Sequence, residues 1–345
     1  MRTLGHCCIH NISPGDVLKP IALAAALAWG GVTSALAQGA AETWPSRPVK
    51  IVVPYAAGGT ADNVARLFAE RLAAKFKQPF IVDNKPGAGG TLGTAVVAKS
   101  PADGYTLLLT TSSPLVINPL IDKTVTYNVD KDLAPVAMLT HMSLLLVSSP
   151  SLPAKNLKEL IAYVKQNPGK LSYASNGYGS YSHMSMEMFK RAIGADLAHV
   201  PYKSAVQAEI DVIGGRVTMM FDSITTGAEL VKRGRLRAFG VSSKSADPIV
   251  PQQQPLAQQG VPALKDFDVS AWSGLLAPRA TPPAAVTALT QAVREMVADP
   301  DFRELMLAHS HVLADPAAVA GMSKVIETDR VKWGQLVKAT GISLD

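Results

Sequence analysis

The sequence predicts an α/β fold made of two doubly wound units with a ligand cleft between them. Apolar runs of about four to eight residues alternate with amphipathic helical patterns, which is typical of parallel sheets covered by helices. Two such series follow one another, and 345 residues suffice for about two domains. Ligands of open α/β sheets bind beyond the carboxyl ends of the strands, so two facing sheets would enclose a ligand.

The first series opens with VKIVVPYAAGGTADNVARLFAERLAAKF, residues 49–76. We expect strands at VKIVVP, PFIVDN and YTLLLTT, with helices at about 60–76 and 91–99. Thr60 is predicted to be the N-cap of the first helix, directly after two glycines. One face of this helix is apolar and predicts its buried side: Ala61, Val64, Ala65, Phe68, Leu72 and Phe76.

The second series starts near MSLLLVSS, at residues 142–149, and continues with strands at LSYAS, LAHVPY, VTMMFD and LRAFGVSS. The helix after the second of these carries Val206, Ile210 and Ile213 on a common face. A loop rich in proline and glutamine follows, and then a strand at SAWSGLLAP. Three helical stretches complete the chain, the first with Pro282 and Pro283 in its first turn.

The chain is expected to return to its first unit at the end. We therefore predict residues 38–143 and 266–345 as a discontinuous first domain and residues 144–265 as the second. Residues 1–37 are predicted to be a secretory signal peptide, because Lys19 precedes an apolar, small-residue stretch that ends in Ala-Leu-Ala. A membrane anchor is the alternative, but glycines interrupt the stretch and it is short for the roughly 20 residues of a span.

Cleavage after Ala37 would remove Cys7 and Cys8, which are the two cysteines of the chain. The exported protein would then use neither a disulfide nor a thiol nucleophile. The net charge of +6 is scattered without a run of like charges, so nucleic acid is not an expected partner. The histidines after residue 37 lack zinc-ligand spacing with Cys or Glu, and no metal or cofactor is predicted.

The first glycine turn, PYAAGGTAD at residues 54–62, predicts an anion site. A helix N-terminus offers unpaired N–H groups and partial positive charge, and Gly58 and Gly59 let an anion approach the backbone. The turn lacks the Gly-Lys-Ser/Thr of a P-loop and the G-x-G-x-x-G of a dinucleotide site. A carboxylate therefore fits as well as a phosphate, and a connection without ligand is the alternative.

Two further glycine-rich segments are candidate sites. NKPGAGGTLG, at residues 84–93, resembles a dinucleotide fingerprint, but it follows the second strand rather than the first. YASNGYGSYSHMSMEMF, at residues 173–189, is the second unit's counterpart of the first turn. Ser180 or Ser182 can cap the helix there. A hydrolase would use Ser180 as nucleophile and His183 as base, yet no G-x-S-x-G elbow is present.

Many of these segments, in this order, resemble the Bug family, the periplasmic solute-binding proteins of tripartite tricarboxylate transporters. The resemblance runs from about Trp44 to Ile342 and is carried by these stretches: WPSRPVKIVVPYAAGGTAD, NKPGAGGTLGT, DGYTLLL, INP, YASNGYGS with a following His, HVPYK, FD and WSGLLAP. It implies a two-lobed, hinge-closing, type II-like periplasmic binding protein without catalytic activity, which acts as a monomer and delivers a small carboxylate to membrane permease subunits or a signalling partner.

The resemblance also implies which residues form the site. The two glycine loops would hold one carboxylate, largely through backbone amides, and the rest of the ligand varies between members. The first loop maps onto Tyr55, Ala57, Gly58, Gly59, Thr60 and Asp62. The second maps onto Ser175, Asn176, Gly177, Gly179, Ser180 and His183. Four more residues are expected to line the cleft: Ser112, Ser113, Asp222 and Trp272.

Two positions depart from the family pattern. Ala57 stands where many relatives have proline, and Ser204 stands where Val-Pro-Tyr-Lys is usually followed by glycine. Tyr178 and Tyr181, in a variable part of the second loop, could narrow the pocket or stack on an aromatic ligand. The alternatives to a transport receptor are an orphan receptor without a transporter of its own and an exported hydrolase or dinucleotide-binding enzyme.

Overall fold

The structure is a computed structural model that describes residues 44–344. The predicted signal peptide and its cleavage site lie outside the described residues. By its internal contacts the chain divides between Ser46 and Arg47, and the fold described below is that of the residues from Arg47 onward. Among the described residues, no helix is both long enough and apolar enough to cross a membrane.

The first sheet begins with three parallel strands, β1 (Val49–Val53), β2 (Phe80–Asn84) and β3 (Thr106–Thr111). The helices α2 (Thr60–Phe76) and α3 (Thr91–Ala98) connect them. These elements confirm the predicted strand–helix alternation. The next strands of this sheet, β9 (Ser270–Pro278) and β4 (Leu133–Ser148), run antiparallel to their neighbours. The prediction of wholly parallel sheets is therefore wrong, because β9 arrives from the other sheet rather than through a helical crossover.

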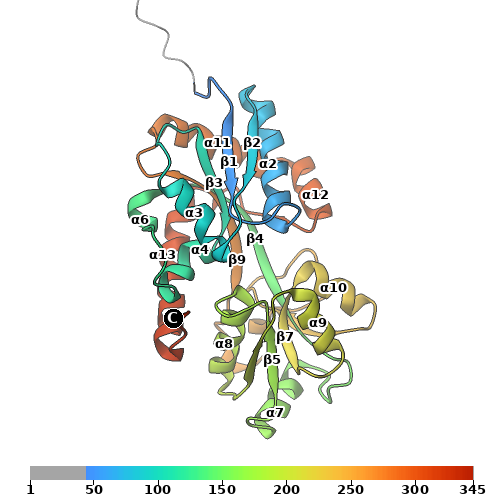
Figure 1. The fold of residues 1–345 in the computed structure, drawn as a ribbon. Helices are drawn as coiled ribbons and strands as arrows, with labels where there is room; N and C mark the ends of the chain where they lie inside the picture. Colours follow the sequence, from blue (N-terminus) through green and yellow to red (C-terminus); the bar gives the residue numbers. More distant parts are fainter. Residues whose placement is uncertain (1–43, 345) are drawn as a thin grey trace, which may run out of the picture. The chain divides into compact units, whose positions relative to one another are not determined.

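Strand β4 belongs to both sheets and runs from one lobe into the other (Figure 1). Its residues from Leu133 to Ser143 pair with β9, and those from Leu144 to Ser148 pair with β7 and β8. The predicted strand at MSLLLVSS is thus the end of a longer one that begins at Leu133.

The second sheet contains β5 (Ser172–Ser175), β6 (Ala198–Pro201), β7 (Met219–Ser223) and β8 (Arg237–Val241) beside the end of β4. Strands β5, β6 and β7 are parallel, whereas β7 and β8 are antiparallel to β4. Four helices accompany these strands: α7 (Leu157–Gln166), α8 (Tyr181–Ile193), α9 (Ala205–Ile213) and α10 (Ile224–Lys232).

The end of the chain returns to the first sheet. Three helices and a short strand form it: α11 (Pro283–Ala298), α12 (Pro300–Ala308), β10 (Val312–Leu313) and α13 (Met322–Thr340). Helix α11 begins at Pro283, which confirms the predicted proline at the helix start. Strand β10 pairs with β4, and Phe302 of α12 meets Phe68 of α2 edge to face at 5.2 Å.

Short helical segments that the sequence did not indicate fill the connections. They are α4 (Ser113–Val116), α5 (Asn118–Ile121), α6 (Val129–Asp132) and the 3₁₀ turns η1 (Ala88–Gly90), η2 (Leu256–Gln258), η3 (Pro262–Leu264) and η4 (Val319–Gly321).

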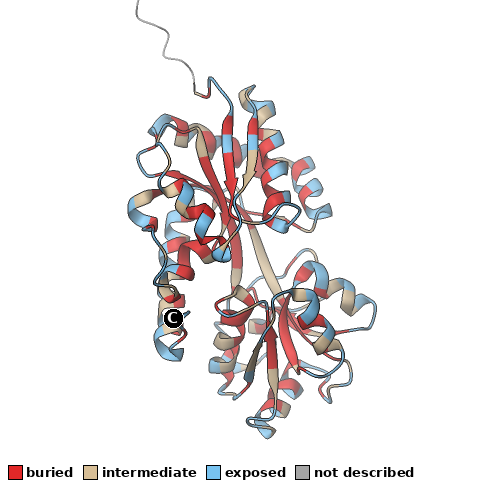
Figure 2. Ribbon diagram, in the orientation of Figure 1, coloured by how far each residue is buried: buried red, intermediate tan, exposed pale blue. Residues whose placement is uncertain are grey.

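Most strands are largely buried, except β2 and β6, and the helices expose their outer faces (Figure 2). In α2 the predicted apolar face is buried from Ala61 to Leu72, while Phe76 at its end is half-buried. Helix α9 differs from the expectation. Its apolar face with Val206 and Ile210 is exposed, and Ala208 and Val212 contact the sheet instead.

Candidate functional site

The first glycine loop joins β1 to α2. Gly58 has φ +81°, a left-handed conformation that glycine adopts without strain. The N-cap of α2 is Gly59, and Thr60 is the first helical residue, so the predicted Thr60 cap is wrong. Because Gly59 has no side chain, it cannot accept a hydrogen bond from the N–H groups of the first helical turn, and α2 has no side-chain N-cap. These donors are available to an anion.

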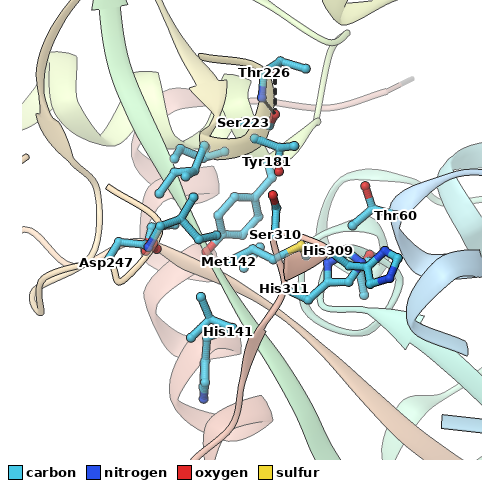
Figure 3. A pocket seen from close by; sticks show the side chains of 18 of the residues that line it. Thr60, His141, Met142, Tyr181, Ser223, Thr226, Asp247, His309, Ser310 and His311 are labelled. Carbon is cyan, nitrogen blue, oxygen red and sulfur yellow. Dashed lines mark hydrogen bonds between the residues drawn. The ribbon is translucent and has the colours of Figure 1, made fainter. Parts of the chain in front are cut away.

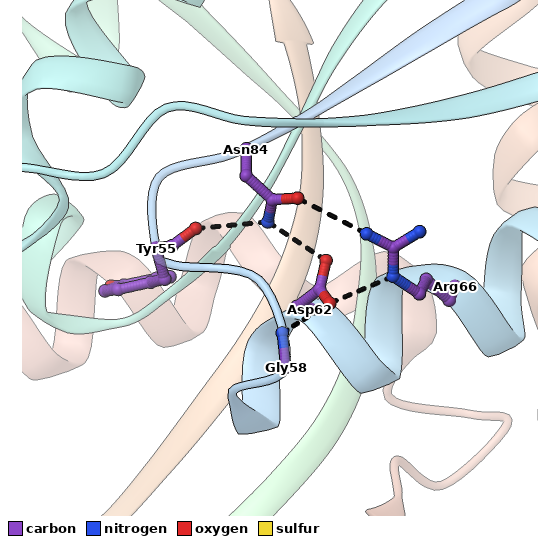
Figure 4. A network of polar contacts seen from close by, with 5 residues as sticks. All are labelled: Tyr55, Gly58, Asp62, Arg66 and Asn84. Atoms are coloured by element: carbon purple, nitrogen blue, oxygen red, sulfur yellow. Dashed lines mark hydrogen bonds and ion pairs between the residues drawn. The ribbon is translucent and has the colours of Figure 1, made fainter.

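Asp62, in the first turn of α2, forms a hydrogen-bond network with the backbone of the first glycine loop (Figure 4). The side chain is buried, and its carboxylate accepts bonds from Gly58 N–H at 2.8 Å, Arg66 Nε at 2.9 Å and Asn84 Nδ2 at 2.9 Å. Burial alone would raise the pKa of Asp62, but these bonds outweigh it and hold the pKa below its ordinary value. Asn84 also donates to the carbonyl of Tyr55. Asp62 therefore positions the loop.

The second glycine loop joins β5 to α8 and has two residues with positive φ, Gly177 at +108° and Gly179 at +72°. Ser180 is the N-cap of α8, and its Oγ accepts the N–H of His183, which confirms one of the two predicted caps. The Nδ1 atom of His183 accepts the N–H of Gly179 at 3.0 Å. A side chain at Gly179 would clash with Cδ1 of Ile121, so this loop packs tightly against the first lobe.

The rings of His183, His199 and Tyr178 pack together next to the second glycine loop. The imidazoles of His183 and His199 lie 4.0 Å apart, and Tyr178 covers His183 at 4.7 Å. His199 Nε2 bonds to Oγ of Ser175 at 2.6 Å. Burial, with a smaller effect of His199, lowers the pKa of His183 to about 4. Neither imidazole bonds to Oγ of Ser180, which accepts the backbone N–H of His183 and meets Oγ of Ser182, so the Ser180–His183 nucleophile–base pair of a hydrolase is not formed.

Two cavities lie where the loops of both lobes meet. The tyrosine-side cavity has a volume of about 440 Å³ and is lined by both glycine loops, through Tyr55 and Asn176 among others. The histidine-side cavity has a volume of about 380 Å³ (Figure 3). It is lined by the first turns of α2 and α10 and by the connection between α12 and β10. Thr111, Ser113 and Tyr181 line both cavities.

Seven of the predicted site residues line at least one of the two cavities: Tyr55, Thr60, Ser112, Ser113, Asn176, Gly179 and Ser180. Four others belong to the same loops without lining either cavity: Ala57, Gly58, Gly59 and Gly177. The remaining predicted residues are buried behind the cavity walls: Asp62, Ser175, His183, Asp222 and Trp272.

The expectation that Trp272 and Asp222 line the cleft is therefore wrong. Trp272 is 1% exposed, and its Nε1 donates to Asp329 at 2.8 Å in the interior. Its neighbour Ala271 lines the cavity instead, because successive side chains of a strand point to opposite faces. Asp222 is fully buried and accepts the N–H of Ser223 at 2.8 Å. Burial, together with Glu209, raises the pKa of Asp222 to about 7.

The sequence analysis missed several residues of the histidine-side cavity, among them His141, Asp247, His309 and His311. They come from separate connections of the chain, and no local pattern links them. Ser310, between two of these histidines, has φ +59°, which is uncommon for a residue with a side chain. This conformation follows directly on the end of α12 and turns the chain into β10.

Residues 64–342 match the model of the tripartite tricarboxylate transporter family receptors, TctC, and the chain belongs to this family. The Bordetella pertussis protein BugT is 34% identical over 307 residues, which cover 88% of this chain and 92% of BugT. The family is made of solute-binding receptors rather than enzymes, so this chain is a periplasmic solute-binding receptor.

Solved structures of relatives share the two-lobed fold. One is R. palustris Rpa4515 with adipate, at 31% identity and a TM-score of 0.74, covering 87% of this chain and 99% of that one. Another is MatC from Rhodopseudomonas palustris with bound malate, at 31% identity and a TM-score of 0.70. It covers 85% of this chain and 100% of that chain.

Proposed function

We propose that this receptor captures a small organic acid between its lobes and delivers it to the permease subunits of a tripartite tricarboxylate transporter. The observation that carries the proposal is the first turn of α2, which faces the histidine-side cavity through Thr60 and lacks a side-chain cap. Its N–H groups would bind one carboxylate from the first lobe. The second loop would contact the same ligand from the other side, through residues such as Asn176 and Ser180.

The energies suffice for such a complex. A hydrogen bond to a charged group contributes about 1.5–3 kcal/mol, and three or four of them exceed the roughly −8 kcal/mol of a micromolar complex. Part of this surplus offsets the entropy lost when the ligand and the loops are ordered. The adipate and malate in the titles of two relatives support a carboxylate as the class of ligand.

We further propose that the lobes are residues 38–143 with 266–345 and residues 144–265, and that they close around the ligand. The change of pairing partner between Ser143 and Leu144 of β4 supports this division. A ligand can shift the hinge equilibrium only by its differential affinity for the closed state. Contacts to both glycine loops at once would supply that difference.

Export through cleavage near Ala37 belongs to the same proposal, as does a monomeric receptor. A receptor without a transporter of its own, acting in signalling, is the alternative. Permease genes beside this one would favour transport, and growth on the identified acid that does not depend on those genes would favour the alternative.

A thermal-shift screen tests whether the ligand binds through a carboxylate. Small acids would be compared with their own amides or alcohols, which keep the body of the ligand and remove the charge. An acid at about 100 times its dissociation constant should stabilise the protein by about 2.7 kcal/mol. Equal stabilisation by acid and amide would contradict a carboxylate site.

A further inference from the structure

The wall of the histidine-side cavity is mainly apolar and comes from both lobes. Strand β4 contributes Met142 and Leu144, and β10 contributes Val312. From the second lobe, Ile224 begins α10 and Ile249 lies in the connection after β8. An apolar surface of this kind binds the hydrocarbon part of a ligand, because removing apolar surface from water is favourable.

The cavity walls contain acidic residues but no permanent cation. Among the described residues that line the two cavities, none is a lysine or an arginine. The histidine-side cavity contains Asp247, which is 5% exposed and accepts the N–H of Ile249 through Oδ1 at 3.0 Å. The tyrosine-side cavity contains Asp122. A second anionic group of a ligand would meet a like charge in either cavity.

Two of the three histidines of the wall, His141 and His311, do not replace the missing cation at neutral pH. Burial lowers the pKa of His141, although Asp268 and Asp329 act in the opposite direction. Burial also lowers the pKa of His311, with a smaller effect of His309. Both buried imidazoles are therefore mainly neutral, and they can donate or accept hydrogen bonds.

Three buried polar atoms of residues in this wall have no hydrogen-bond partner among the described residues. They are Oγ of Ser112, a fully buried residue, the hydroxyl oxygen of Tyr181, and Nε2 of His311, a residue that is 5% exposed. Buried polar groups of folded proteins are almost always bonded, so such atoms indicate a site that a bound molecule completes. The two hydroxyls and the neutral imidazole are uncharged under neutral conditions and suit a neutral polar substituent better than a second carboxylate.

On the basis of the proposed function, we infer that the ligand is a monocarboxylate with an apolar body, and that Asp247 discriminates against a second carboxylate. The single carboxylate would bind at the first turn of α2, and the aliphatic or aromatic body would fill the histidine-side cavity. A dicarboxylate would bury its second charge beside Asp247 without a counter-ion, which is unfavourable. The expected ligand thus differs from the adipate and malate of the two relatives.

Matched acids test this inference by isothermal titration calorimetry. Hexanoate and adipate have the same carbon chain and differ by one carboxylate, and benzoate and terephthalate form an aromatic pair. We expect at least one monocarboxylate to bind at least about tenfold more tightly than its dicarboxylate partner. Hexanol and benzamide report on the anion site itself.

The variant Asp247→Asn keeps an oxygen that can accept the N–H of Ile249 and removes the charge. We expect it to raise the affinity for the dicarboxylates more than the affinity for the monocarboxylates. The ratio of monocarboxylate to dicarboxylate affinity should therefore fall by about fivefold or more. The control is Asp268→Asn. Asp268 is exposed, accepts the N–H of Lys244 at 3.0 Å and lines neither of the two cavities, so the ratio should stay unchanged.

The outcomes test three claims separately: the monocarboxylate ligand, the role of Asp247 and the proposed carboxylate site. Dicarboxylates that bind as tightly as their partners would overturn the monocarboxylate inference and leave the carboxylate receptor intact. A ratio that Asp247→Asn does not change would remove Asp247 as the discriminating residue. Hexanol or benzamide binding as well as the acids would overturn the proposed carboxylate site itself. If no acid of the four binds at about 1 mM, the inferred ligand class is wrong.

Discussion

The backbone N–H of Gly179 donates to Nδ1 of His183 at 3.0 Å, so the second glycine loop is held by an imidazole that must be unprotonated at that atom. The bond closes the loop onto the helix that follows it. Protonation of His183 would place a hydrogen on Nδ1 and break the bond. It would also place a positive charge against the stacked ring of His199, 4.0 Å away.

We therefore predict that the protein loses stability as the pH falls from about 6.5 towards 4. The pKa of His183 in the folded state, about 4, lies below its ordinary value of 6.5. The unfolded state thus binds more protons in this window, and the stabilisation is complete only above the unfolded pKa. The effect is on the order of 3 kcal/mol. Glu187 opposes the shift, and Lys190 adds to it.

Urea unfolding at several pH values measures this effect, with His183→Asn as the test variant. Asparagine offers an acceptor for the N–H of Gly179 but does not titrate, so the slope of stability against pH should become smaller. His309→Asn, at an exposed histidine, is the control and should change the slope less than His183→Asn, because His309 has only a smaller effect on the pKa of His311. An unchanged slope in His183→Asn would show that other groups cause the pH dependence.

Gly179→Ala should destabilise the protein more than Gly194→Ala, by at least about 1 kcal/mol. Both glycines have positive φ, +72° and +64°, so both alanines would strain the backbone by about 1–2 kcal/mol. A Cβ at Gly179 would also clash with Ile121, whereas nothing lies within 4 Å of one at Gly194. Equal losses in chemical denaturation would mean that the contact between the loop and Ile121 is absent in solution.

Asp62→Asn should destabilise the first loop and weaken ligand binding, although Asp62 lines neither cavity. The amide would present donor hydrogens to Arg66 or Asn84, which already donate to the carboxylate. We expect a loss of about 1–3 kcal/mol in the free energy of unfolding. Glu327→Gln, at an exposed pair with Lys324, is the control and should change stability by less than about 1 kcal/mol. Wild-type affinity in Asp62→Asn would remove its positioning role.

Trp272→Phe and Trp333→Phe separate a buried hydrogen bond from buried volume. Both indoles are almost fully buried, but Nε1 of Trp272 donates to Asp329, whereas Nε1 of Trp333 has no partner among the described residues. Trp272→Phe should therefore cost about 1–3 kcal/mol more in thermal or chemical unfolding. The opposite order would argue against the bond to Asp329.

The strands and long helices could be predicted from local sequence patterns, because the apolar run of a strand and the apolar face of a helix each lie within one short segment of the chain. The loop after β1 was predictable for the same reason, since Gly58 and Gly59 stand directly between a strand and a helix. The direction of β9 was not, because it depends on how the chain returns from the second sheet. The exposed apolar face of α9 shows that periodicity identifies which residues share a helix face but not whether that face packs against the sheet.

The far wall of the site could not be predicted from a motif. His311 and Asp247 come from connections that are distant in sequence, and only the folded chain brings them into the same cavity. The strand that carries Trp272 was correctly predicted to reach the cleft, but the side of the strand that faces the cleft was not. The side chain that reaches the cavity belongs to Ala271, one residue earlier.

The most direct test of the central claim is the affinity of Gly59→Val for the acid that stabilises the wild-type protein most. Gly59 and Gly321 both precede helices, with φ −81° and −82°, and neither site would place a Cβ in a tight contact. Valine at position 59 would cover the first-turn N–H groups of α2, whereas Gly321→Val is a control at a helix start that lines neither cavity. We predict that calorimetry will find at least about a hundredfold weaker binding for Gly59→Val and wild-type binding for Gly321→Val. Equal affinity in the two variants would contradict a carboxylate site at the start of α2.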